Sequence, residues 1–168
     1  ALPPFWALGF HQSRRGYRSV EDLENVVKGY ESNDIPLDTI WSDIDYMVDY
    51  ETFTFDEKRF PLKNITKLME KYRYVLTVPA GIKVNGSAYA EAQKRGVVLK
   101  SAEGSEFVGS GLAGKSVFVD YFHANASAYW EAMLGVLYNK VKFSGVWLTM
   151  NEPTNLCDGP CEQQNKTG

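Results

Sequence analysis

The chain has 168 residues, of which 44% are hydrophobic and 14% aromatic, and its formal net charge is -3. This length and apolar content suit one soluble domain with a buried core. The mild acidity and the scattered lysines argue against nucleic-acid binding, which would need a basic face, and no apolar run approaches the ~18 residues that a membrane span needs. The opening Ala-Leu-Pro-Pro lacks the features of a signal peptide, and we expect a mature or excised segment.

Short β-like runs alternate with amphipathic helical stretches, which is the pattern of a parallel sheet with crossover helices. The first predicted strand covers residues 6–11. The helix after it is capped by Ser19, has apolar residues at close to 3.6-residue spacing, and is stopped by residues 33–36. The second predicted strand covers residues 37–43.

The remainder of the chain continues this alternation. A loop rich in aromatic and acidic residues (46–60) precedes a second helix whose apolar face includes Ile65 and Leu68. We expect the later elements in the following order: a third strand at 74–78, a Gly/Ser-punctuated region at 81–114 with a short helix at 88–94, a helix at 126–141, and a fourth strand at 144–150.

Four β/α units make about half of a (β/α)8 barrel, which takes ~250 residues. The predicted fold class is therefore α/β, half of a TIM barrel with about four parallel units. No GxGxxG motif follows the first strand, which argues against a dinucleotide-binding sheet. Half a barrel leaves open strand edges, which invite pairing with another segment or with another copy of the chain.

Two cysteines, Cys157 and Cys161, lie in a turn-like stretch near the end of the chain. A lone pair without nearby histidines lacks the partners of a zinc site. We therefore expect a local disulfide that pins a loop.

Four Asn-x-Ser/Thr sequons occur, where about one is expected from average usage. Such sequons are acceptors for N-linked glycans in secretory proteins, and that route also permits a disulfide. The sequons indicate a glycoprotein of the secretory pathway, lysosomal or extracellular; they begin at Asn64, Asn85, Asn125 and Asn165.

In a parallel barrel, binding residues gather where strands end and loops begin. The first strand ends in Gly-Phe-His-Gln (9–12), and the second lies within Ile35-Pro-Leu-Asp-Thr-Ile-Trp-Ser-Asp-Ile-Asp-Tyr-Met47. These strings resemble the catalytic barrel of the retaining α-glucosidases of glycoside hydrolase family 31, such as maltase, sucrase-isomaltase and acid α-glucosidase. The similarity continues in order through the fourth strand, over roughly residues 2–161. It implies that residues 1–152 are the first half of such a barrel and that 153–168 are a loop or tail carrying the disulfide.

The family's chemistry is retaining glycoside hydrolysis, in which one carboxylate attacks the anomeric carbon and a second carboxylic acid protonates the leaving oxygen. The family's fourth-strand motif reads Trp-x-Asp-Met-Asn-Glu. Here it reads Trp147-Leu-Thr-Met-Asn-Glu152, so Thr149 stands at the position of the nucleophile. A threonine hydroxyl is neutral at pH 7 and does not replace a carboxylate, and the acid/base residue belongs to the second half of the barrel. We therefore expect Thr149 not to function and the chain to be inactive as it stands.

Other departures from the family pattern fall at pocket positions, whereas the framework motifs match. They are Val78 for an aspartate, Leu112-Ala113 for Trp-Pro before Gly114, Arg15 for an aromatic residue, and Val48-Asp49 for Asp-Gly. Random decay would not be so selective, which indicates repurposing or deliberate substitution.

The resemblance also places residues that would contact a sugar. Asp43 matches the aspartate that binds glucose hydroxyls, with Ile44 beside it; Trp147 matches an aromatic pocket wall and Met150 a neighbour of the pocket. For Asp43 and Asp45 the alternative is a pair of loop acids, and for Trp147 it is core packing. A supporting role behind the pocket is expected for His11, Gln12, Asn151 and Glu152.

We expect no cofactor and no metal site, because His11 and His123 lack partners at metal-ligand spacing. The expected ligand is an α-glucoside or maltooligosaccharide, and the second half of the barrel or another copy of the chain are the expected macromolecular partners. The main hypothesis is thus an inactive α-glucosidase-like half-barrel with residual glucoside binding. The alternative is a non-catalytic pseudoenzyme that binds a partner through its open barrel edges.

Overall fold

The computed structural model describes residues 2–161, and the chain forms two compact units. Each unit is assembled from separate stretches of sequence. The first joins the chain up to Val48 with Thr54–Val78 and Leu137–Trp147. The second joins Asp49–Phe53 with Pro79–Val136 and the chain from Leu148 onward.

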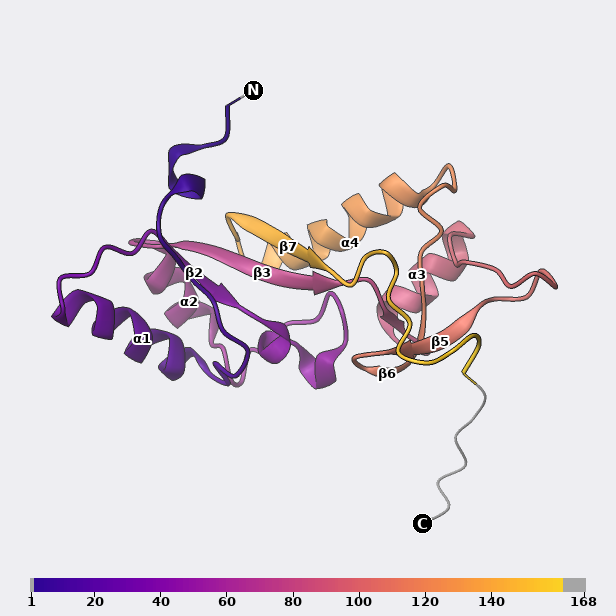
Figure 1. The fold of residues 1–168 in the computed structure, drawn as a ribbon, viewed down its shortest axis with the longest axis horizontal. Helices are drawn as coiled ribbons and strands as arrows, with labels where there is room; N and C mark the ends of the chain where they lie inside the picture. Colours follow the sequence, from indigo (N-terminus) through magenta and orange to yellow (C-terminus); the bar gives the residue numbers. More distant parts are fainter. Residues whose placement is uncertain (1, 162–168) are drawn as a thin grey trace, which may run out of the picture. The chain divides into compact units, whose positions relative to one another are not determined.

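The first unit is built on a four-stranded sheet (Figure 1). The order is β1-β2-β3-β7, and the strands are β1 (His11–Gln12), β2 (Thr39–Ser42), β3 (Arg73–Pro79) and β7 (Gly145–Thr149). β1 pairs parallel with β2, and β2 pairs parallel with β3. Figure 1 shows β7 running in the same direction as β3. The parallel sheet with intervening helices confirms the predicted α/β class.

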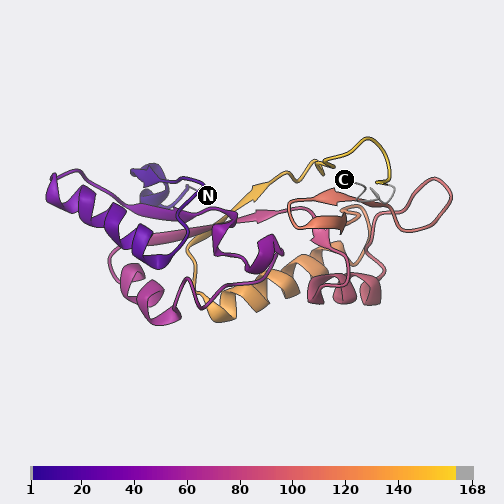
Figure 2. The same ribbon diagram turned by 90° about the horizontal axis from the view of Figure 1, so that it is seen from below.

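Two helices of this unit follow the predicted pattern. Helix α1 (Val20–Ser32) begins where expected, because the Ser19 hydroxyl accepts a hydrogen bond from the Asp22 backbone N–H at 3.4 Å. Helix α2 (Leu62–Met69) buries Ile65 and Leu68. Figure 2 shows α2 below the strands and the N-terminal segment above them.

The prediction of a strand over residues 6–11 is wrong for most of its length. Residues Phe5–Leu8 form a 3-10 helix, η1, and only His11 and Gln12 are extended and paired. Pro4 precedes η1 with φ -65°, and its carbonyl accepts from the Ala7 N–H at 3.0 Å.

The segment between β2 and α2 holds two further 3-10 turns, η2 (Ile44–Tyr46) and η3 (Val48–Tyr50). Within the first unit, Tyr46 is fully buried and donates its hydroxyl to the Thr77 carbonyl at 2.8 Å. Burial raises the pKa of Tyr46 well above its ordinary value, so the phenol stays protonated as a donor. η2 is therefore fixed against β3.

The second unit contains a three-stranded antiparallel sheet that the sequence did not predict. Its order is β4-β6-β5, with β4 (Ile82–Lys83), β5 (Val108–Gly111) and β6 (Gly114–Val117). β5 and β6 form a hairpin closed at Gly111 and Gly114, and Gly114 has φ +90°. This left-handed backbone suits glycine.

Helix α3 (Ser87–Arg95) lies between β4 and β5 in the chain, and helix α4 (Ala126–Lys140) follows β6. The buried Tyr129 at the start of α4 donates its hydroxyl to the carbonyl of Ala88, in the first turn of α3, at 3.0 Å. The Phe53 ring packs edge-on against Tyr129 and Trp130, with centroids 6.5 Å and 5.3 Å away. These contacts form the core of the second unit around α4.

Candidate functional site

A row of aromatic rings crosses the sheet of the first unit. The Trp41 ring lies edge-on to Trp147 and to His11, with centroids 5.9 Å apart in each pair. His11 also lies 6.1 Å from Trp6. Since side chains on a strand alternate between faces, these contacts place His11, Trp41 and Trp147 on one face of the sheet. Trp147 keeps 40% of its surface exposed.

The hydrogen bonds of His11 fix the form of its ring. The Trp41 indole N–H donates to His11 Nδ1 at 3.0 Å, and His11 Nε2 lies 3.2 Å from the Trp6 carbonyl oxygen. An indole N–H can only donate, so Nδ1 is the acceptor and Nε2 carries the proton. His11 thereby holds the Trp41 ring in position.

Gln12, beside His11, has a purely structural arrangement. Its side-chain amide donates to the Tyr17 hydroxyl at 2.7 Å and accepts from the Tyr30 hydroxyl at 2.5 Å. Both ends of the amide are therefore used to hold the segment before α1 and the end of α1.

Asp43 and Asp45 occupy different environments, although they are only two residues apart. The Asp43 carboxylate accepts from the Ile44 N–H at 2.6 Å, caps η2, and stays partly exposed. Asp45 is buried and accepts from the Gly16 N–H at 2.8 Å. Ile44 is also buried. Asp45 is thus a structural acid, whereas Asp43 retains access to solvent at the end of β2.

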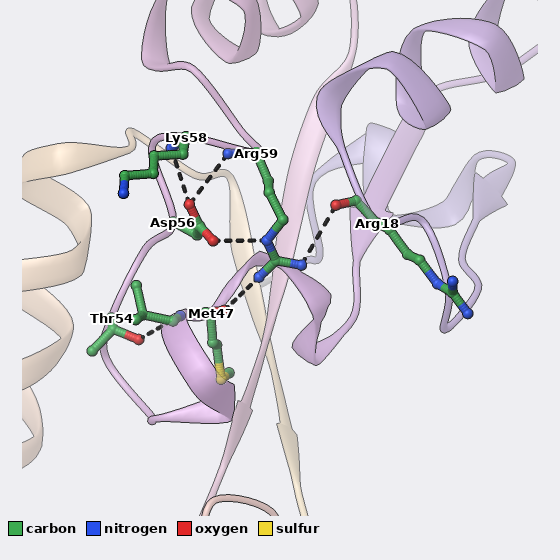
Figure 3. Close-up of polar contacts among 7 residues, drawn as sticks. Arg18, Met47, Thr54, Asp56, Lys58 and Arg59 are labelled. Carbon is green, nitrogen blue, oxygen red and sulfur yellow. Dashed lines mark hydrogen bonds and ion pairs between the residues drawn. The ribbon is translucent and has the colours of Figure 1, made fainter.

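Arg59 holds the segment that follows Asp43 (Figure 3). Its guanidinium donates to the Asp56 carboxylate at 2.7 Å and to the Met47 carbonyl at 2.8 Å, and it lies 3.5 Å from the Arg18 carbonyl. The Asp56 carboxylate also accepts from the N–H groups of Lys58 and Arg59. The hydrogen bond from Arg59 is the main reason that the pKa of Asp56 lies below its usual range. These bonds connect Arg59 to Asp56 and to Met47 within the first unit.

β7 ends at Thr149, the residue that the resemblance to family 31 places at the nucleophile position. Thr149 is partly exposed, and its carbonyl accepts from the Asn151 side-chain amide at 2.7 Å. Met150 has φ +57°, a left-handed conformation that is uncommon for a non-glycine residue. Glu152 is exposed and accepts from the Thr154 hydroxyl at 2.6 Å, and this bond is the main cause of its lowered pKa.

Tyr121 is a residue of this region that the sequence did not single out. Its hydroxyl donates to Asn151 Oδ1 at 2.7 Å, and its ring stacks on Trp130 with an interplanar angle of 24°. Partial burial raises the pKa of Tyr121 to about 12, so the hydroxyl remains a donor at neutral pH. Both ends of the Asn151 amide are therefore hydrogen-bonded within the protein. A tyrosine beyond a strand carries no motif, so only the fold reveals this contact.

The end of the described chain is attached to β5. A disulfide joins Cys157 and Cys161, whose Cα atoms lie 6.1 Å apart. The side chain of Asn155, two residues before this small loop, donates to the carbonyls of Cys157 and Gly159 and accepts from the Ser110 N–H at 2.9 Å. Asn155 therefore connects the disulfide loop to the antiparallel sheet.

The other departures from the family pattern lie in varied settings. Val78 is fully buried in β3, and Arg15 is exposed in the loop after β1. Leu112 and Ala113 form the turn of the β5–β6 hairpin. Asp49 has φ +47°, a left-handed conformation. It matches the glycine of the family's Asp-Gly, and glycine adopts this conformation with less strain.

In residues 2–161, no group of three His, Cys, Asp or Glu side chains is placed to hold a metal ion. His123 accepts a hydrogen bond from the Asn125 N–H at 3.1 Å near the start of α4. None of the helices seen in that same range is long and apolar enough to cross a membrane. Asn165 lies outside the described residues.

Comparison with known proteins identifies relatives along the whole chain. Residues 1–168 match the model of the glycosyl hydrolases family 31 TIM-barrel domain. Glucoamylase 1 of Candida albicans is 39% identical, over 96% of this chain and 18% of its own length. The alpha-glucosidase of Mucor javanicus is 36% identical, over 95% of this chain and 19% of its own length. The chain thus spans about a fifth of the length of these relatives.

Solved structures share the fold. One is the crystal structure of an ER glucosidase II heterodimeric complex, which consists of the catalytic subunit and the binding domain of the regulatory subunit. It superposes with a TM-score of 0.83 at 29% identity and covers 92% of this chain and 18% of that one. The glucosidase II alpha subunit in a DNJ-bound form gives a TM-score of 0.81 at 28% identity, covering 89% of this chain and 17% of that chain. The chain belongs to glycoside hydrolase family 31, as an α-glucosidase-like part of its TIM-barrel domain.

Proposed function

We propose that this chain is the glucoside-recognising first half of an α-glucosidase-like barrel, and that it does not carry out hydrolysis because Thr149 replaces the nucleophile. The observation that supports recognition is the exposed Trp147 ring, continued by Trp41 and His11 across one sheet face. Binding sites for small molecules are commonly lined by aromatic side chains with a few polar groups that fix orientation. Asp43, partly exposed at the end of β2, supplies such a polar group.

The proposal of inactivity rests on chemistry at one position. Retaining hydrolysis needs a carboxylate that forms a glycosyl-enzyme bond and a second carboxyl that first protonates the leaving oxygen and later activates water. Thr149 has no charge at neutral pH. Trp147 and Thr149 lie two residues apart on β7, so their side chains share one face of that strand.

The test of inactivity is hydrolysis of p-nitrophenyl α-glucoside. The chain and its Thr149→Asp variant are each assayed alone and mixed with a second-half barrel fragment from a family relative. We expect turnover only when Thr149→Asp and the fragment are combined. Thr149→Asn is the matched control, because it has the size of aspartate without the charge and should remain silent. Turnover by the unmodified chain at an enzyme-like rate would show that the proposal is wrong.

The test of recognition is isothermal titration with millimolar maltose. We expect a weak heat of binding that Trp147→Ala and Asp43→Asn each abolish. Tyr138→Ala is the matched control, because Tyr138 is an aromatic residue of similar exposure, 44% against 40% for Trp147. Absence of heat with the unmodified chain, or equal loss in all three variants, would remove the recognition hypothesis.

A second candidate function is partner binding at the β1 edge, and a specific observation favours it. Large apolar side chains in the segment that leads into β1 are highly exposed: Leu2 at 94%, Phe5 at 90% and Leu8 at 72%. Contiguous exposed apolar side chains mark interaction surfaces. The partner that we propose is the remaining set of barrel units, which would pair with the edge strand. Light scattering of the chain with the second-half fragment should show a one-to-one complex that Phe5→Asp weakens; persistence of separate species would exclude this function.

A further inference from the structure

The sequons differ in what their asparagine side chains already do. An N-linked glycan is bulky, so the asparagine that carries it must lie at the surface with its amide nitrogen open to solvent. Three sequons lie among the described residues and can be compared on this criterion, those of Asn64, Asn85 and Asn125.

Two of these asparagines use the amide nitrogen inside the fold. Asn64 lies within α2, is only partly exposed, and donates through Nδ2 to a Glu24 carboxylate oxygen at 3.0 Å. Asn125 is exposed, but its Nδ2 donates to the Arg95 carbonyl at 3.1 Å. Each nitrogen thus lies against another element, and a bulky sugar bonded to it would crowd the oxygen that it contacts.

Asn85 is arranged differently. It lies in the turn between β4 and α3, where the Gly86 N–H donates back to the Lys83 carbonyl at 3.2 Å. Asn85 is exposed, and its side chain makes no hydrogen bond to any residue in the described part of the chain. Its φ of +69° is left-handed, a conformation that asparagine tolerates better than most residues.

The third residue of this sequon is equally accessible. Ser87 is the first residue of α3 and is exposed, and the helix has no side-chain cap at Gly86. The preference of a tight turn for Asn-Gly explains Asn85 and Gly86, but it does not account for a hydroxyl two positions after the asparagine.

We propose that Asn85 is a site of N-linked glycosylation and that Asn64 and Asn125 are not. The co-reactant is an oligosaccharide joined through a diphosphate to a polyprenyl lipid. In the transfer, Asn85 Nδ2 forms a bond to the anomeric carbon, the bond from that carbon to the diphosphate oxygen breaks, Nδ2 loses one proton, and the polyprenyl diphosphate leaves. The inference is independent of the proposed function, because it depends only on the turn and on passage of the chain through a secretory compartment.

The test is expression of the full chain behind a secretion signal in a eukaryotic host. Peptides from whole-cell and secreted protein are treated with a glycanase in 18O-labelled water, which converts each formerly glycosylated asparagine to a labelled aspartate. An identical incubation without the glycanase measures the spontaneous deamidation to which the Asn85-Gly86 sequence is prone, and only label above that level counts as a former glycan. We expect the label at Asn85. It should be lost in Asn85→Asp, which keeps tolerance of the left-handed turn, and in Ser87→Ala, which leaves the asparagine in place.

Three controls separate loss of the acceptor from loss of the fold. Ser87→Thr preserves the sequon and should keep the glycan, whereas Asn64→Gln and Asn125→Gln should leave the glycan pattern unchanged. An unlabelled Asn85 in protein from cells and medium would overturn the proposal. Labelling at Asn64 or Asn125 would overturn the part that excludes them.

Discussion

Replacement of Arg59 by methionine should destabilise the first unit by about 2 kcal/mol at pH 7. The variant keeps the apolar stem but removes the hydrogen bond to the Met47 carbonyl and the ion pair with Asp56. Hydrogen bonds to charged groups contribute about 1.5–3 kcal/mol each, and a solvent-exposed ion pair adds about 0–1 kcal/mol. Because 41% of the Arg59 side chain is exposed, we take a value near the lower end.

The effect should depend on pH. The pKa of Asp56 is depressed in the folded state, mainly by Arg59. The stabilisation linked to this carboxylate is therefore complete above the unfolded-state value of about 3.9 and is lost as the pH falls through the folded-state value. Below pH 4, the difference between the native chain and Arg59→Met should shrink toward the contribution of the Met47 hydrogen bond alone.

The measurement is urea denaturation followed by tryptophan fluorescence at pH 7 and pH 3. Lys71→Met is the matched control, because Lys71 forms an ion pair with Glu31 in which both side chains are more exposed, 64% and 43%. Its effect should be clearly smaller. Equal destabilisation by the two substitutions, or a penalty for Arg59→Met that stays constant between the two pH values, would refute the reasoning.

Three further predictions concern packing and the chain end. Leu137 is fully buried in α4, and Leu137→Ala should lower the free energy of unfolding by about 2–5 kcal/mol. Val136 on the same helix is half exposed, and Val136→Ala should change that free energy by less than about 0.5 kcal/mol; denaturation curves measure both. Tyr129→Phe removes the hydrogen bond to α3 and should cost about 1 kcal/mol; the exposed Tyr138→Phe should cost measurably less, and equal losses would contradict this. Asn155→Ala should accelerate proteolytic cleavage of the chain end without changing cleavage elsewhere, because it releases the disulfide loop from β5; an unchanged cleavage rate would argue against that role.

Periodicity predicted the helices and the central strands well. Ser19 was predicted to cap the first helix, and α1 begins directly after it. The predicted third and fourth strands overlap β3 and β7. The antiparallel sheet was missed because β5 and β6 are four residues each and contain Gly109, Gly111 and Gly114. Glycine is depleted in strands, and these pairings are made by distant contacts rather than by local propensity.

Part of the candidate site could likewise be predicted from the sequence, and part of it could not. The motif around Asp43 could be recognised from sequence because consecutive residues carry it. Arg59 and Tyr121 could not be recognised, because their partners Met47 and Asn151 lie 12 and 30 positions away along the chain. Such contacts depend on how loops close, and a single sequence holds no periodic signal for them.

The interleaved construction of the first unit has a consequence for its synthesis on the ribosome. Its last stretch begins at Leu137, and the preceding one ends at Val78. At about 5–20 residues per second, translation of the intervening segment takes roughly 3–12 s. During that time β3 has emerged without β7, and the N–H and C=O groups on the edge that β7 would cover are unpaired. Chaperone binding and strand pairing with other chains therefore compete with folding of the nascent chain during this interval. Slower translation of the codons for residues 79–136 would prolong it.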